Sequence, residues 1–353
     1  MKKIATTFLL LTISFLSANE IGLNLLNEKE LKTKLNYNKI NDTIDVFNIK
    51  ESELGSVNVG SIGDASGLDI SLGYGIDSYN SIYYNFEYLS INYGDTELKN
   101  KKHEIFGKIN LNPYIENLLL PLSVDLGFTH NSSDDISLKN DSFLNSMIQK
   151  IRPGTTMVFK DGGVSYKGST LYIVNRGGIV PFMKIANMSD LSFFIRAVGN
   201  LEFQNSTLNL YAGVKTTSIE SDVVLHDIIQ DILNVEVEGT DLKRDEESIF
   251  FGFNYVYNYQ DFLFEGGYEY LNIFGREDNV KLTDDNHIFK GSISRKLNDK
   301  ITVFIGGKAM LHQFNGVIPY LYNRYTKNRY TKKYGYAKIG FIYSFDTSVL
   351  RVY

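Results

Sequence analysis

The chain has 353 residues, a formal net charge of −5 and no cysteine. Without cysteine, the protein can form neither a disulfide framework nor a thiolate metal site. The slightly acidic balance also lacks the basic surplus that nucleic-acid-binding domains usually carry, so no nucleic-acid partner is expected. After the N-terminal apolar stretch, no run of apolar residues approaches the roughly twenty that a membrane-spanning helix needs.

The N-terminus has the three parts of a secretory signal peptide. Lys2 and Lys3 supply the positive charge, residues 4–16 are apolar, and Ser17 and Ala18 provide the small residues of a cleavage site. An apolar stretch of this length is too short to span a bilayer as a helix. The pattern predicts a signal peptide over residues 1–18, cleaved after Ala18, and therefore an exported protein.

From Leu54 onward, apolar and polar residues alternate in segments of about nine to thirteen residues, a pattern typical of transmembrane β-strands. In one clear segment, Leu68, Ile70, Leu72 and Tyr74 share a face. The alternation recurs in residues 82–88, 122–128, 191–203 and 249–257. Tyr (24) and Phe (23) are abundant whereas Pro (5) is rare, which also favours strands.

Short and long connections alternate between these segments. The short ones lie at Asp77–Asn80, Arg176–Gly178, Gln204–Ser206, Tyr259–Asp261 and Asn298–Lys300. The long, largely polar ones lie at Asn131–Lys167, Glu220–Ser248, Gly275–Asn286 and Gln313–Tyr334. Short turns at one end and long loops at the other are typical of barrels with periplasmic turns and extracellular loops.

Over residues 54–345 the chain resembles porin-like outer-membrane β-barrels of Gram-negative bacteria. The resemblance implies an all-β protein located in the outer membrane: a transmembrane, antiparallel up-and-down barrel of about 14 strands, within a range of roughly 12–16. Leu54–Ile62 is its expected first strand. The last strand, Gly335–Phe345, resembles the aromatic-terminated strand by which the barrel assembly machinery recognises such proteins, and residues 346–353 follow as a short tail.

The segments outside this pattern leave alternatives open. Residues 19–53 could form a hairpin, an extra strand pair, or a periplasmic or lumenal segment. Helical periodicity in Asp141–Ile151 and Asp222–Asn234 predicts one or two short helices in the loops. They could cap the barrel, narrow a pore or provide an apolar landing site. The last arrangement is similar to the long-chain fatty acid transporters, although no N-terminal hatch motif is visible here.

If the apolar face of each strand meets lipid, the opposite face lines the lumen. By this parity the lumenal acids are Asp69, Glu87, Glu104, Asp125, Glu202, Glu265 and Glu269, and the lumenal bases are Lys108, Lys184, Arg196, Lys215, Lys290, Lys296, Lys308 and Lys338. The near balance predicts a weakly charge-selective lumen. The pore-lining candidates are Lys108, Arg196, Lys215, Glu265, Glu269, Lys290, Lys296 and Lys308.

Two interpretations of these charges remain open. In a filled barrel they satisfy one another, and the neighbouring strands that carry Glu265 and Glu269, and Lys290 and Lys296, are expected to pair across the sheet. In a water-filled pore, opposed clusters create a transverse field. Both interpretations give a polar interior, but only the second gives conductance.

The sequence gives little sign of an enzyme. Asp284, Asp285 and His287 lie together near a predicted extracellular rim, which is similar to outer-membrane proteases. His103 and His130 fall on apolar faces without a nucleophile motif nearby. No phosphate loop, calcium loop or zinc spacing is present. No catalytic residue, cofactor or metal is therefore expected.

The function that these patterns favour is passive diffusion of small hydrophilic solutes. The alternatives are transport of hydrophobic or fatty-acid-like compounds, and adhesion or structural support, for which the Tyr- and Lys-rich loop Tyr320–Tyr334 is the only sign. The expected partners are outer-membrane lipid and lipopolysaccharide, small solutes and the barrel assembly machinery. The oligomeric state is left open.

Overall fold

The computed structural model describes residues 22–40, 62–93, 96–115, 120–137, 154, 158–160, 163–166, 169–172, 174–175, 178–179, 183–225, 240–241, 243–274, 283–312, 314–322 and 333–347. The predicted signal peptide and the predicted helix Asp141–Ile151 lie outside these residues. In the described part of the chain, no helix is long and apolar enough to cross a membrane.

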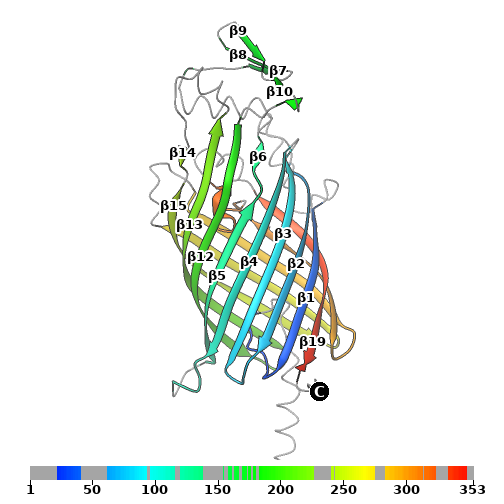
Figure 1. Cartoon of the computed structure of the whole chain (residues 1–353). Coiled ribbons are helices and arrows are strands. Elements are labelled where there is room, and N and C mark those ends of the chain that lie inside the picture. The colour runs from blue at the N-terminus through cyan, green and yellow to red at the C-terminus, as the bar shows by residue number, and fades with distance from the viewer. Residues whose placement is uncertain are drawn as a thin grey trace, which may run out of the picture.

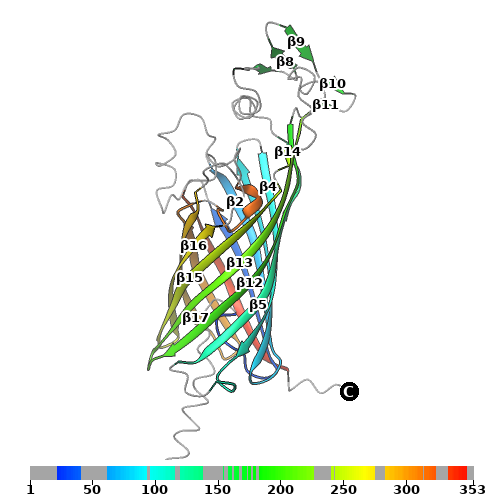
Figure 2. The same cartoon turned by 90° about the vertical axis from the view of Figure 1, so that its left-hand side faces the viewer.

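Twelve antiparallel strands form the wall of a closed barrel (Figures 1 and 2). They are β1 (Glu30–Ile40), β2 (Ile62–Gly75), β3 (Asn80–Tyr93), β4 (Thr96–Asn110), β5 (Leu122–Ser133), β12 (Met183–Glu202), β13 (Ser206–Leu225), β15 (Arg244–Tyr259), β16 (Phe262–Phe274), β17 (Asp285–Lys296), β18 (Ile301–Met310) and β19 (Tyr334–Asp346). The first and last strands close the barrel, in register from Glu30 opposite Asp346 to Lys39 opposite Ala337.

The expected count of about 14 strands is wrong, because alternation does not reveal which segments pair within the wall. The first wall strand is β1, so the barrel begins at Glu30 and not at residue 54. The predicted turn Arg176–Gly178 joins no wall strands. It falls between β10 (Val174–Asn175) and β11 (Gly178–Ile179), which form a separate sheet. These strands are too short to cross a bilayer, which takes about nine to eleven residues.

Five further short strands complete the described secondary structure. β7 (Val158–Lys160), β8 (Gly163–Tyr166) and β9 (Ser169–Tyr172) form another small sheet, while β6 (Ile136–Ser137) and β14 (Thr240–Asp241) pair with the far ends of β12 and β13. The second predicted loop helix is wrong at its start, because Asp222–Leu225 belong to β13; its remainder lies outside the described residues. The helical structure described is a 3-10 turn, Pro319–Leu321.

The four other predicted short turns are confirmed, and they lie at the barrel end where β1 begins and β19 ends. We call this the periplasmic end, following the usual orientation of such barrels. In one turn, Asp77 Oδ1 accepts hydrogen bonds from the backbone amides of Tyr79 (2.7 Å) and Asn80 (2.8 Å). Hydrogen bonds from the Asn80 side chain and the Tyr79 amide lower the pKa of the Asp77 carboxyl group. Asn298 forms the same kind of turn before β18, as Asx residues commonly do.

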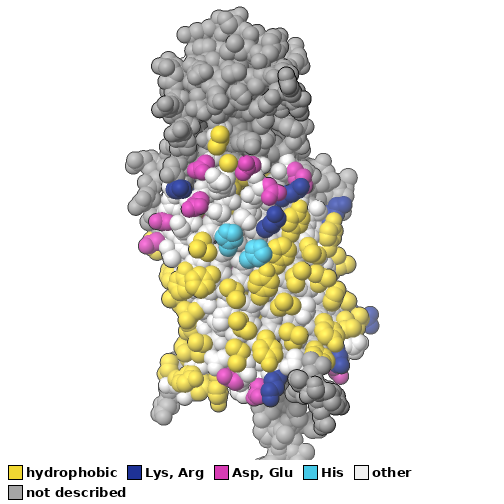
Figure 3. Space-filling view, in the orientation of Figure 1, with side chains coloured by type: hydrophobic (Ala, Val, Ile, Leu, Met, Phe, Trp, Pro, Cys, Tyr) yellow, Lys and Arg dark blue, Asp and Glu magenta, His cyan; other side chains and the backbone are white. Residues whose placement is uncertain are grey.

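The wall is apolar outside and polar inside. Along β15, Ile249, Phe251 and Phe253 are exposed, whereas Ser248 and Asn254 at either end of this run are buried. Figure 3 shows apolar side chains spread over the outer wall, with acidic and basic side chains gathered above and below them. This arrangement is inside out for a water-soluble protein and fits a wall immersed in lipid.

Candidate functional site in the barrel lumen

An N-terminal segment, residues 22–29, enters the lumen at the periplasmic end before the chain joins the wall as β1. Tyr83 OH donates a hydrogen bond to the Asn24 carbonyl oxygen (2.7 Å), and the Leu26 amide donates to Ser81 Oγ (3.1 Å). Leu26 packs in a buried cluster with Tyr83, Phe106 and Phe194. Residues 22–29 are therefore a lumenal segment, one of the alternatives that the sequence left open.

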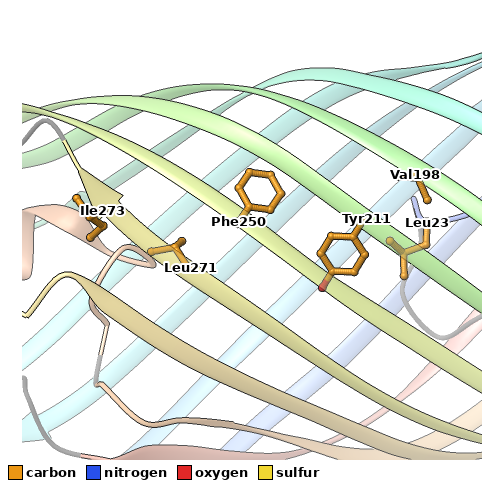
Figure 4. Packing of buried hydrophobic residues seen from close by; sticks show 6 residues of the cluster. All are labelled: Leu23, Val198, Tyr211, Phe250, Leu271 and Ile273. Atoms are coloured by element: carbon orange, nitrogen blue, oxygen red, sulfur yellow. The ribbon is translucent and has the colours of Figure 1, made fainter.

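An apolar strip runs from this segment across the inner wall. It consists of Leu23, Val198, Tyr211, Phe250, Leu271 and Ile273, which follow one another over four wall strands (Figure 4). Each is at most 9% exposed. The lumen therefore carries this apolar strip and the Leu26 cluster among its polar side chains.

A buried ion network lies near the periplasmic end of the lumen. Asp125 on β5 stands opposite Lys108 on β4 and Arg196 on β12. Lys108 Nζ lies 2.7 Å from Asp125 Oδ1, and both side chains are 0% exposed. The Arg196 guanidinium donates to Asp125 Oδ2 through Nε at 2.7 Å and contacts it through Nη2 at the same distance. One carboxylate thus joins three strands and compensates two cations.

At the extracellular end, residues 314–322 fold into the barrel; we call them the inward loop. Lys215 Nζ donates to the Gly316 carbonyl oxygen (2.7 Å). Arg244 Nη2 donates to the carbonyl oxygens of Pro319 (3.0 Å) and Tyr322 (2.6 Å). Tyr320 OH, almost fully buried, donates to Asn100 Oδ1 (2.7 Å). These contacts fix the loop to β4, β13 and β15.

Gly316 is the position in the inward loop where only glycine fits without strain. Its φ of +70° lies in the left-handed region that other residues rarely adopt. A Cβ atom there would lie 2.4 Å from Leu271 Cδ2 of the apolar strip. The glycine therefore allows the loop backbone to approach β16 closely while its carbonyl group points to Lys215.

A cavity of about 280 Å³ lies in the lumen beside the inward loop, whose Gly316 and Val317 form part of its lining. Its charged lining residues are Lys34, Lys102, Arg196, Lys215, Lys290, Lys308 and Lys338 on the basic side, and Asp69, Glu87, Glu104 and Glu269 on the acidic side. Seven bases against four acids give a surplus of three positive charges. The cavity is therefore more basic than the near balance that parity predicts for the whole lumen.

Five of the eight predicted pore-lining residues line this cavity: Arg196, Lys215, Glu269, Lys290 and Lys308. The other three do not. Lys108 is held in the buried network, Glu265 accepts a hydrogen bond from Ser292 Oγ (2.8 Å), and Lys296 pairs with Asp299 (3.5 Å) near the periplasmic end.

The expected cross-strand pairing is present for one pair. Lys290 Nζ lies 3.7 Å from Glu269 Oε2, which also accepts a hydrogen bond from Tyr211 OH (2.9 Å). Whether any of these residues lines a conducting pore remains a prediction.

The parity assignment does not include two charged residues of the cavity, although the sequence pattern around each of them indicates a lumenal position. Lys102 has the same parity as Glu104 and Lys108 on β4. Lys34 alternates with Leu31, Thr33 and Leu35 in β1, so the period-two pattern also occurs before residue 54.

His103, His130 and His287 lie on the outer face of the wall. His287 Nε2 is 3.3 Å from Asp285 Oδ2, and Nδ1 is 2.8 Å from Tyr268 OH. His103 Nδ1 is 2.9 Å from Tyr84 OH. The two tyrosine–histidine contacts join neighbouring strands, β16 to β17 and β3 to β4.

The closed wall, its exposed apolar belt and its polar lumen define a porin-like β-barrel protein of the bacterial outer membrane. Wall strands of 10 to 20 residues are long enough to cross a bilayer, and closure leaves no unpaired edge in the lipid.

No protein-family model and no curated protein matches the chain. Similar solved structures include the translocator domain of autotransporter NalP from Neisseria meningitidis, at 6% identity and a TM-score of 0.49 over 98% of both chains. The NanC porin is similar at 8% identity and 0.43, over 88% of this chain and 98% of that one. A Pseudomonas aeruginosa FadL homologue is similar at 9% and 0.46, over 91% of both. At these values none of the three carries information on the activity of this chain.

Proposed function

We propose that the protein is a narrow channel for passive diffusion of small hydrophilic solutes. The observation that supports this proposal is the polar cavity. Eleven of its lining residues are charged, and the inward loop lies beside them. Water and small polar solutes are stabilised by such a lining, whereas a lumen filled for stability alone would leave no cavity of this size.

The inward loop sets the width of the proposed path. Because Arg244 holds two of its carbonyl groups, replacing that residue with Met removes both hydrogen bonds and loosens the loop. The matched control is Arg295→Met, since the Arg295 side chain lies outside the barrel over the Phe262 ring.

The test is planar-bilayer recording of the purified, folded protein. The wild type should give small, discrete ohmic steps, Arg244→Met larger ones, and Arg295→Met steps of wild-type size. Silence of both the wild type and Arg244→Met, in samples shown to be folded, would overturn the proposal.

A second candidate is transport of hydrophobic or fatty-acid-like compounds, and the apolar strip from Leu23 to Ile273 favours it. Such a protein should be silent in bilayers but bind a long-chain amphiphile saturably. Phe250→Asp should then abolish binding, because it places a charge in the middle of the strip. Under the channel proposal the same variant still conducts, with its charge selectivity shifted toward cations because Phe250 also lines the cavity.

A further inference from the structure

Four lysines form one side of the cavity on four neighbouring strands. Lys290 lies on β17, Lys308 on β18, Lys338 on β19 and Lys34 on β1. We call them the basic wall. Adjacent strands are about 4.8 Å apart, so the basic wall extends over roughly 15 Å of the lumen circumference.

Two members of the basic wall face each other directly. Lys290 and Lys308 are register partners in the β17–β18 ladder, and both line the cavity. Like charges directly opposite each other destabilise a sheet. Sheet packing therefore gives no reason for this pairing, whereas an anion between the two ammonium groups would.

The carboxylates of the described residues compensate the basic wall only in part. Glu269 contacts Lys290 (3.7 Å), and Asp69 is held by amide groups of Asn36 (2.6 Å) and Asn38 (2.7 Å). Glu87 interacts electrostatically with Lys308 and Lys338, but also with Lys102, which is not part of the wall.

The two other lysines of the wall are placed over an aromatic ring. The Nζ atoms of Lys34 and Lys338 lie 5.1 Å and 6.0 Å from the centroid of the buried Phe304 ring. For Lys308, no ion pair or hydrogen bond of the ammonium group is found among the described residues. The wall thus presents more positive charge to the cavity than its acids neutralise.

We infer that the basic wall is a binding site for a small organic anion that carries two or more carboxylate or phosphate groups. The inference deepens the proposed function by naming the solute class, and it rests on that function for its role in permeation. Binding itself does not depend on conduction. Two acidic groups about 5 Å apart match the spacing of adjacent strands, and each would accept charge-assisted hydrogen bonds from a lysine.

The experiment is isothermal titration of the folded protein with citrate at low ionic strength. The wild type should bind citrate at one site. Lys308→Gln and Lys338→Gln should each weaken binding at least about tenfold, as the loss of one charge-assisted contact does. The control is Lys296→Gln, a lysine with lumenal parity that is paired with Asp299 outside the cavity, and it should bind as the wild type does.

Lys308→Gln is expected to fold, because it removes the repulsion from Lys290. Absence of citrate binding by the wild type, or equal binding by all variants, would overturn the site. Recording the same samples in bilayers separates the two proposals. Binding without conductance retains the anion site and rejects the channel, whereas conductance without binding does the reverse.

Discussion

The buried network around Asp125 gives the sharpest stability prediction. In Asp125→Asn the shape is kept, but Lys108, which is 0% exposed, and Arg196 lose their shared counter-charge. Removing one member of a buried ion pair and leaving its partner charged costs about 3–5 kcal/mol. Lys108→Met should cost clearly less, because Asp125 keeps both contacts from Arg196.

Urea titration in detergent measures these differences. The chain has no Trp, so the folded fraction is best read from gel mobility, since a closed barrel resists detergent until heated. The double variant Lys108→Met/Asp125→Asn should recover part of the loss, because the remaining cation, Arg196, is 19% exposed. Equal losses in the two single variants would refute the claim that one carboxylate compensates both cations.

Three further predictions follow from the cavity, the inward loop and the periplasmic turns. Lys290→Glu should shift the reversal potential toward cation preference at low salt, with a smaller shift at high salt because of screening, whereas Lys296→Glu should shift it little; equal shifts would contradict the cavity assignment. Gly316→Val should destabilise the inward loop and enlarge single-channel steps, and steps of wild-type size in a folded sample would count against the loop as the constriction. Asp77→Asn removes a carboxylate whose pKa is lowered by folding, so its stability difference from the wild type should be present at pH 6 and fade as the pH falls below about 4; a pH-independent difference in urea midpoint would argue against this.

The period-two pattern was sufficient to predict which side chains face lipid. In β19, for example, Ile339, Phe341 and Tyr343 are exposed as expected. The pattern is reliable there because one face of each strand meets the lumen and the other meets lipid. Successive side chains alternate strictly between these two faces. The pattern failed for β1, because its lysines make the alternation of apolar residues less clear. It also could not show that the short strands between Val158 and Ile179 lie outside the wall.

The cavity itself could not be predicted, because the inward loop at its extracellular end is held by long-range contacts. The Tyr320–Asn100 hydrogen bond joins residues 220 positions apart, and the Lys215–Gly316 contact joins residues 101 apart. Local sequence patterns contain no information about such long-range contacts. Parity therefore placed Lys215 and Lys308 on the lumenal face correctly. It could not show which chain segments lie beside them in the lumen.

The registers of four neighbouring strands also fix how deeply the protein sits in the bilayer. On β4, β5, β12 and β13, one row of outward side chains reads His103, His130, Leu191 and Ser218, and the next row toward the extracellular end reads Lys101, Ser132, Ser189 and Glu220. In the next row below, the outer side chains are Ile105, Phe128, Phe193 and Thr216, and the first three are apolar and exposed. The hydrocarbon boundary thus passes close to the histidine row, and the extracellular ends of β12 and β13 project beyond it. The outer side chains of the wall therefore set how deeply the barrel is immersed. A thinner or thicker membrane has to deform to match the height of this apolar surface.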